Sequence, residues 1–273
     1  MTRRPMTSAM RRLSWIAALC VLCLGVGTAG LGPAGAVVSS TPNEHPFNGL
    51  RAVGALFPKG SATHVCSASV VASRSGDLLL TAAHCFSGAT SGWTFVPDYN
   101  EGRAPYGSWS VTGVYPSKAW RSATSPAGDY AVVRVASRQI DGRRRTLQSV
   151  VGANRLSRAP RAGTTVTVPA YDLGRNDRPV TCTTKVFYDG VYPGFACGGY
   201  LGGTSGAPWL VATRRGTEVV GVIGGLHQGG CTPSISYSAP FGVATGRLVA
   251  SANRGAPPRS VPIRPSDGCT NGF

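Results

Sequence analysis

The apolar residues of this 273-residue chain fall into short runs that glycine, serine, threonine and proline interrupt. Residues 243–253, VATGRLVASAN, favour a short helix near the C-terminus. Eight other runs are rich in β-branched and apolar residues and are expected to be strands: 50–58, 68–73, 77–84, 129–135, 164–171, 181–188, 207–212 and 218–225. The short runs and frequent turn residues predict an all-β architecture rather than an α/β one.

Residues 1–36 have the pattern of a signal peptide. A basic segment is followed by an apolar, uncharged stretch from Trp15 to Val26, and Ala34-Gly35-Ala36 supplies a cleavage site of small residues. We expect cleavage after Ala36 and export from the cell. The apolar stretch is shorter than the roughly 20 residues that a membrane span needs, which disfavours an uncleaved anchor. The Arg11-Arg12 pair leaves open whether export uses the general or the twin-arginine route.

The rest of the chain divides by composition into three parts. Residues 37–47 are polar and are expected to form an exposed arm, residues 48–253 hold all the expected strands and the helix, and residues 254–273 form a proline-rich tail. The formal net charge is +16, and loss of the four arginines of the leader leaves +12. The arginines are scattered, so no specific nucleic-acid binding is expected, although a weak attraction to an anionic cell envelope remains open.

Six cysteines follow the expected cleavage site, an even number that indicates three disulfides in an exported chain. No two of them have the C-x2-C spacing typical of zinc sites, so no metal is expected. The six are Cys66, Cys85, Cys182, Cys197, Cys231 and Cys269.

Three polar residues stand in contexts that suit nucleophilic catalysis. Ser205 lies in GGTSGAPW, His84 in LTAAHC and Asp129 in AGDYAVV. A serine hydroxyl needs a base to take its proton, and a histidine base needs an acceptor on its other ring nitrogen. The other histidines after the leader, His45 and His64 among them, have no comparable surroundings. Both partners precede the serine, which excludes the chain order of an α/β-hydrolase.

These motifs resemble those of the trypsin/chymotrypsin-like serine peptidases over roughly residues 48–253. TAAHC matches the segment around the histidine of that family, and GTSGAP matches the loop of its nucleophile. The resemblance implies two six-stranded antiparallel β-barrels with the site between them. It also implies Ser205 as nucleophile, His84 as general base and Asp129 as its orienting partner, with the backbone N–H groups of Gly203 and Ser205 as the oxyanion hole. No cofactor is implied, and a monomer that cleaves protein or peptide substrates is expected.

The sequence departs from the family at two places. Thr204 stands where the chymotrypsin branch has an aspartate that pairs with a new N-terminus, so we expect an oxyanion loop that forms without that ion pair. The specificity pocket is expected to include Gly199 in place of the tryptic aspartate. Its far wall is expected in VIGGLHQGG, residues 222–230, with Gly224, Gly225 and Leu226 facing the pocket. Glutamate-specific relatives place a histidine in this wall, but a simple alignment puts Ile223 there and His227 only nearby.

The resemblance also places a disulfide between Cys66 and Cys85. A bridge between Cys197 and Cys231 occurs in many relatives. We prefer Cys182–Cys197, because a short hairpin-like segment joins them, and this leaves Cys231–Cys269 to hold the tail. Two rival functions keep the same fold, namely a non-catalytic binding module and an esterase.

Overall fold

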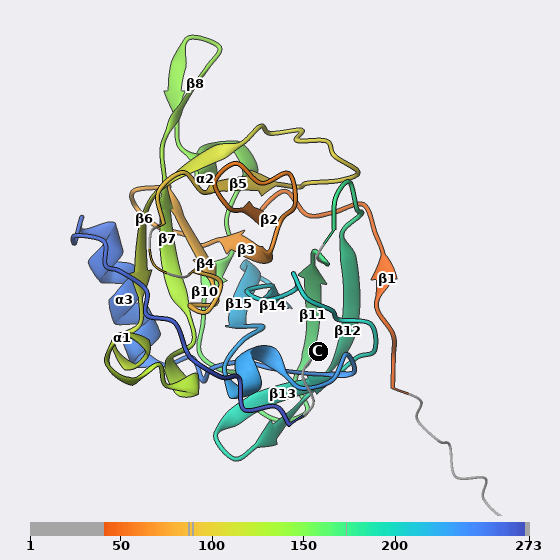
Figure 1. The fold of residues 1–273 in the computed structure, drawn as a ribbon. Helices are drawn as coiled ribbons and strands as arrows, with labels where there is room; N and C mark the ends of the chain where they lie inside the picture. The colour runs from red at the N-terminus through yellow and green to blue at the C-terminus, as the bar shows by residue number, and fades with distance from the viewer. Residues whose placement is uncertain (1–40, 87, 89, 173, 271–273) are drawn as a thin grey trace, which may run out of the picture. The chain divides into compact units, whose positions relative to one another are not determined.

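The computed structural model describes residues 41–270 except residues 87, 89 and 173 (Figure 1). The expected signal peptide and its cleavage site lie outside the described residues. Residues 41–47 of the expected arm run along the body of the protein, because Glu44 N donates to Gly198 O at 2.8 Å and strand β1 (His45–Pro46) pairs with the strand that holds Thr181.

The N-terminal half forms a closed barrel in which every neighbouring pair of strands is antiparallel. In the order around the barrel, its six strands are β2 (Val53–Phe57), β3 (Cys66–Val70), β4 (Leu78–Thr81), β7 (Ala131–Val135), β6 (Trp109–Pro116) and β5 (Thr94–Pro97).

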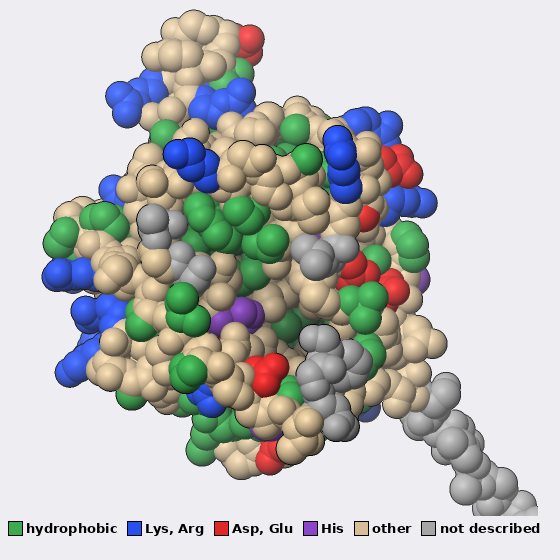
Figure 2. All heavy atoms as spheres, viewed as in Figure 1, with side chains coloured by type: hydrophobic (Ala, Val, Ile, Leu, Met, Phe, Trp, Pro, Cys, Tyr) green, Lys and Arg blue, Asp and Glu red, His purple; other side chains and the backbone are tan. Residues whose placement is uncertain are grey.

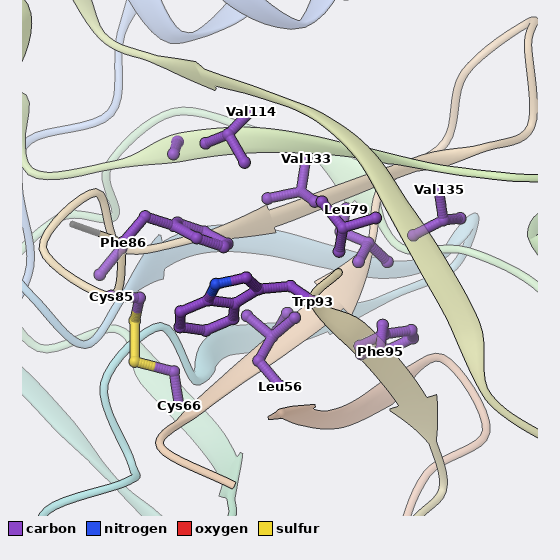
Figure 3. Packing of buried hydrophobic residues seen from close by; sticks show 14 of the residues in the cluster. Leu56, Cys66, Leu79, Cys85, Phe86, Trp93, Phe95, Val114, Val133 and Val135 are labelled. Carbon is purple, nitrogen blue, oxygen red and sulfur yellow. A yellow bond between two sulfur atoms is a disulfide. The ribbon is translucent and has the colours of Figure 1, made fainter. Parts of the chain in front are cut away.

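Aromatic and branched side chains fill the interior of this barrel (Figure 3). Trp93 packs against Phe86 with 4.7 Å between ring centroids, and Leu56 and Leu79 lie in the same buried cluster. The Cys66–Cys85 disulfide borders this cluster and ties β3 to the segment that follows β4.

The C-terminal half forms a second sheet. Its strands are hydrogen-bonded in the order β10 (Arg155–Leu156), β15 (Gly216–Val222), β14 (Pro208–Thr213), β11 (Thr165–Ala170), β12 (Val180–Asp189), β13 (Tyr192–Ala196) and β16 (Ile235–Tyr237). All of these pairs are antiparallel except β10 with β15. Gly224 N, just after β15, donates to Tyr237 O at 2.9 Å, so the ends of the six antiparallel strands meet. The predicted fold class of two antiparallel barrels is confirmed.

The two barrels share a buried core. Alternate residues of a strand point to opposite faces, and accordingly Leu79 of β4 lies in the interior of the first barrel, whereas Leu78 and Leu80 join a second cluster. That second cluster also includes Leu210 and Val222 from the other barrel. Burial on both faces explains why β4 reads as a continuous apolar run in the sequence.

Five short helices and a hairpin complete the described part of the chain. The hairpin of β8 (Arg138–Ile140) and β9 (Arg143–Arg145) projects from the first barrel (Figure 1). The helices are α1 (Lys118–Ala123), η1 (Pro126–Gly128), α2 (Leu147–Val151), η2 (Leu226–Gly229) and α3 (Val243–Asn253). The last of them has the bounds expected from the sequence. Across residues 41–270, apart from the three omitted ones, no helix has the length and apolar character to cross a membrane.

The disulfides have the pairing preferred from the sequence. Besides Cys66–Cys85, the structure contains Cys182–Cys197 and Cys231–Cys269. The first of these two links β12 to the residue after β13, and the second ties the C-terminal tail to the second barrel.

Candidate active site

His84 and Asp129 come from two neighbouring strands of the first barrel. His84 follows the end of β4, and Asp129 precedes β7, which pairs with β4 in the register Thr81 to Ala131. The antiparallel register therefore brings the end of one strand beside the start of the other. His84 Nδ1 lies 2.7 Å from Asp129 Oδ2, and the side chain of Asp129 is fully buried.

Three N–H groups surround the Asp129 carboxylate. His84 donates from its backbone N to Oδ1 at 3.0 Å, and Gly225 donates from its backbone N to Oδ2 at 2.9 Å, beside the bond from the His84 ring. A buried carboxylate is costly unless its oxygens are hydrogen-bonded, and these donors satisfy both. Because Asp129 can only accept here, His84 Nδ1 carries the proton and Nε2 is left as an acceptor.

Ser205 reaches this free nitrogen from the second barrel. It lies in the loop before β14, and its Oγ stands 2.7 Å from His84 Nε2. The hydroxyl therefore donates to the imidazole, and the imidazole donates to the carboxylate. This arrangement allows the ring to accept the serine proton while the carboxylate stabilises the imidazolium.

The turn before Ser205 depends on a glycine. Thr204 N donates to Leu201 O at 3.3 Å, and Gly203, the third residue of this turn, has a φ of +99°. A positive φ at this position defines a turn that favours glycine. Among the described residues, no hydrogen bond is formed by the backbone N–H of Gly203 or of Ser205. Both donors therefore remain available beside the serine hydroxyl.

Thr204 closes the same turn with its own side chain. Its Oγ1 donates to Leu201 O at 2.7 Å, and the residue is 3% exposed. The loop is thus held by a neutral bond between residues three apart.

Ser67 of β3 holds the loop from the first barrel. Its backbone N donates to Ser205 O at 2.8 Å, and its Oγ donates to Gly203 O at 3.2 Å. The same Oγ accepts from Tyr171 N at 2.9 Å. Nothing in the sequence pattern singled out this serine, because its role depends on a contact across 136 positions.

Gly206 leaves no room for a side chain. Its φ is +80°, and a Cβ placed there would lie 2.0 Å from Thr81 Oγ1 and 2.3 Å from Ser67 O. We expect Gly206→Ala to lower the free energy of unfolding by about 2–5 kcal/mol, the sum of backbone strain and steric overlap. Thermal unfolding measures this loss. Gly60→Ala is the matched control, because Gly60 has a φ of +71° and nothing within 4 Å of the added Cβ. An equal loss in both variants would show that the contact with the first barrel contributes nothing.

A cavity opens beside Ser205, and part of its wall comes from the expected segment 222–230. Its lining includes His84 and Ser205, and the remaining residues are Tyr200, Leu201, Gly202, Thr204, Ile223, His227, Gln228, Gly229, Gly230, Thr232, Pro233, Ser236 and Asp267. None of the four residues expected in the specificity pocket contributes to this lining. The expectation was close in sequence, since Gly199 adjoins Tyr200 and Leu226 adjoins His227.

The expected pocket glycines have other contacts. A Cβ on Gly199 would lie 2.5 Å from Glu44 Cγ in the N-terminal arm, and one on Gly224 would lie 3.1 Å from Asp129 Oδ2. Gly225 donates its N–H to the same carboxylate. Leu226 begins the short helix η2. Gly224 and Gly225 thus line the Asp129 side of the site instead of the cavity.

A group of acidic residues lies behind the serine loop. Burial raises the pKa of Asp172 to about 6, and the nearby carboxylates of Glu44 and Asp177 add to this increase. The backbone of Leu201 hydrogen-bonds to Asp172 and partly offsets it. Sequence reasoning did not identify Asp172, because its neighbours come from three separate segments.

The other histidines take no part in the contact with Ser205. His64 is fully buried, and its Nε2 lies 2.9 Å from both carboxylate oxygens of Asp177. His45 lies exposed in β1. His227 lines the cavity, and its Nδ1 lies 3.1 Å from the backbone oxygen of Asp267.

One group of potential metal ligands occurs in the described residues, formed by His227, Cys231 and Cys269. The two sulfurs are joined in a disulfide and are not thiolates, which are the form that binds metals. This group therefore does not have the chemistry of a metal site.

The model of the family described as Trypsin matches residues 38–243, more than half of the chain. The chain belongs to the trypsin family. The family assignment agrees with the resemblance of the motifs around His84 and Ser205, and it covers both barrels. The trypsin family is a family of serine-type peptidases.

Solved structures show the same fold as this trypsin-family chain. The protease Anisep from Arthrobacter nicotinovorans superposes with a TM-score of 0.66 at 23% identity, over 78% of this chain and 100% of that one. A Glu endopeptidase gives a TM-score of 0.60 at 18% identity, over 80% of this chain and 100% of that one.

A curated relative matches a shorter part. The extracellular metalloprotease of Bacillus subtilis (strain 168) is 28% identical over 102 residues, which are 36% of this chain. The chain spans 31% of the length of that relative.

Proposed function

We propose that this protein is a secreted serine endopeptidase that hydrolyses peptide bonds through Ser205, His84 and Asp129. The observation that carries the proposal is the continuous chain of contacts from Ser205 Oγ through the imidazole to the buried carboxylate, 2.7 Å at each step. Membership of the trypsin family supports the same chemistry.

In the proposed mechanism, Ser205 Oγ forms a bond to the substrate carbonyl carbon while His84 Nε2 takes the hydroxyl proton. The carbonyl oxygen becomes an oxyanion that accepts hydrogen bonds from the N–H groups of Gly203 and Ser205. The C–N bond then breaks, the leaving amine takes the proton from His84, and an acyl-enzyme remains. A water molecule then bonds to the acyl carbon and gives a proton to His84 Nε2. The ester C–O bond breaks, Ser205 Oγ takes that proton back, and the acid is released.

We also propose that the oxyanion turn forms without pairing to a new N-terminal amine. The neutral bond from Thr204 Oγ1 to Leu201 O and the two bonds from Ser67 support this, because they hold the loop with groups inside the described chain. Removal of the signal peptide after Ala36 would then suffice for activity. Three disulfides support an oxidising location outside the cell.

The test is labelling with a fluorophosphonate, which reacts with an activated serine. We expect the wild-type protein to be labelled and Ser205→Ala not to be. Protein that retains residues 31–36 should be labelled as well, since the turn needs no free amine at Val37. No labelling of the wild type would support a non-catalytic binding module, and labelling that appears only after trimming would refute the self-supported turn. Hydrolysis of simple esters without hydrolysis of peptides would indicate an esterase.

A further inference from the structure

The C-terminal tail contributes one wall of the cavity beside Ser205. After α3 the tail runs across the face drawn in Figure 1 towards the second barrel. Asp267, near its end, lines the same cavity as Ser205 and His84. Asp267 is therefore far from the motifs in sequence but adjacent to the site in space.

The tail is fixed along its length. Arg259 N donates to Val114 O at 2.9 Å, and Val261 is 2% exposed in the core of the first barrel. Trp120 Nε1 donates to Pro262 O at 3.1 Å. The disulfide from Cys269 to Cys231 then holds the end of the tail beside the cavity. These contacts hold Asp267 in one place.

The Asp267 carboxylate has one oxygen to spare. Oδ1 accepts from Cys269 N at 2.8 Å, and the backbone oxygen of the same residue is the partner of His227 Nδ1 at 3.1 Å. Within the described residues, Oδ2 forms no hydrogen bond and no ion pair. The free oxygen can therefore accept from a bound ligand.

The charge of the cavity is unusual for this chain. Its lining contains no lysine or arginine, and Asp267 is its one carboxylate, although the full chain has 27 basic and 11 acidic residues. On the face drawn in Figure 2, most basic side chains lie towards the margins, although one lies close to the acidic side chain near the middle, where a histidine is also exposed. A fixed carboxylate in a pocket without lysine or arginine favours a cationic occupant.

We propose that Asp267 is a specificity-determining residue that selects substrates with a lysine or arginine side chain at the residue whose carbonyl Ser205 attacks. The inference rests on the proposed peptidase activity. The side chain of that residue enters the cavity because the cavity opens directly at Ser205. Its ammonium or guanidinium group donates to Asp267 Oδ2, and the hydroxyls of Thr232 and Ser236 in the lining offer further acceptors.

His227, in the same cavity, would favour an acidic substrate side chain if it were protonated. A protonated His227 in the same lining would attract a glutamate or aspartate side chain instead. The bond between its Nδ1 and the Asp267 carbonyl forms equally with a neutral ring, so the structure does not require a positive charge there. The Asp267 carboxylate, whose Oδ2 has no partner among the described residues, therefore decides the preference.

The test compares matched peptide substrates that differ only in lysine, arginine, glutamine or glutamate before the cleaved bond. We expect wild-type kcat/KM to be highest for arginine or lysine. Asp267→Asn should lower it about 10- to 100-fold for these two substrates and leave the value for glutamine within about twofold. Asparagine retains an oxygen for Cys269 N, so the tail should stay in place. Asp141→Asn is the control, because it removes the same charge in the exposed β8–β9 turn.

A binding experiment separates this proposal from the proposed activity. Benzamidine, a small aromatic cation, is titrated into Ser205→Ala and into Ser205→Ala/Asp267→Asn, neither of which needs to turn over substrate. We expect about 10-fold or greater weakening of the Kd when Asp267 is changed. Equal binding by both proteins overturns the proposal, as does a wild-type preference for glutamate that grows in Asp267→Asn. A wild type that binds benzamidine through Asp267 but cleaves no peptide would contradict only the proposed activity.

Discussion

His84→Ala is expected to lower kcat by about a million-fold, and His84→Ala/Ser205→Ala is expected to lose no more than either single variant. The reason is the geometry of one connected unit, in which Ser205 Oγ meets His84 Nε2 at 2.7 Å. Without the imidazole the hydroxyl has no acceptor for its proton. Without the hydroxyl the imidazole has no nucleophile to activate.

The measurement is single-turnover hydrolysis of a peptide with lysine or arginine before the cleaved bond. A residual rate of about 10³- to 10⁴-fold over water is expected in all three variants, because the Gly203 and Ser205 N–H groups still stabilise the oxyanion. His45→Ala is the control, since His45 is an exposed histidine in β1 without a bond to the site. Losses that multiply in the double variant would contradict a single catalytic unit.

Much of the fold could be predicted because many of its strands have a clear local pattern of apolar and β-branched residues. The runs at 77–84 and 164–171 contain β4 and β11, and the helix at 243–253 was correct to the residue. The strands that were missed have weaker patterns. β6, in WSVTGVYP, includes a glycine and an irregularity in register at Val111 to Gly113, and β13, in YPGFA, holds both proline and glycine.

The residues of the candidate site also fall into those that the sequence predicts and those that it does not. His84, Asp129 and Ser205 could be found because each lies in a short motif, and the structure brings the three together. The segment 222–230 could be placed in the wall of the cavity, but the individual residues that face the cavity could not, because spacing along the chain does not fix the loop conformation. Gln228 has a φ of +52° within η2, and such a turn shifts which residues face the cavity. Asp267 could not be predicted for a different reason. It reaches the cavity only through the Cys231–Cys269 disulfide and the contacts of the C-terminal tail.

Asp129→Asn is expected to lower kcat by about 10⁴-fold while the protein remains folded. The wild-type carboxylate accepts three hydrogen bonds, one of them from the His84 ring. The amide of asparagine has one oxygen and one NH2 group, and all three groups that face Asp129 are N–H donors. In either orientation, the NH2 group therefore faces an N–H group that the carboxylate accepted from. When the NH2 group faces His84 Nδ1, the proton moves to Nε2, which can then no longer take the proton of Ser205.

Two measurements test this change of tautomer, namely kcat over a range of pH and the ¹⁵N resonances of the His84 ring. We expect protonation at Nε2 in Asp129→Asn and at Nδ1 in the wild type. Asp177→Asn is the matched control, because Asp177 pairs with His64 at 2.9 Å in the same chemical manner but does not contact Ser205. That variant should lower the free energy of unfolding by about 1–3 kcal/mol and leave kcat within about twofold. Equal losses of kcat in the two variants would mean that Asp129 acts through stability alone. A reduced rate with the His84 proton still on Nδ1 would mean that Asp129 acts mainly by stabilising the imidazolium.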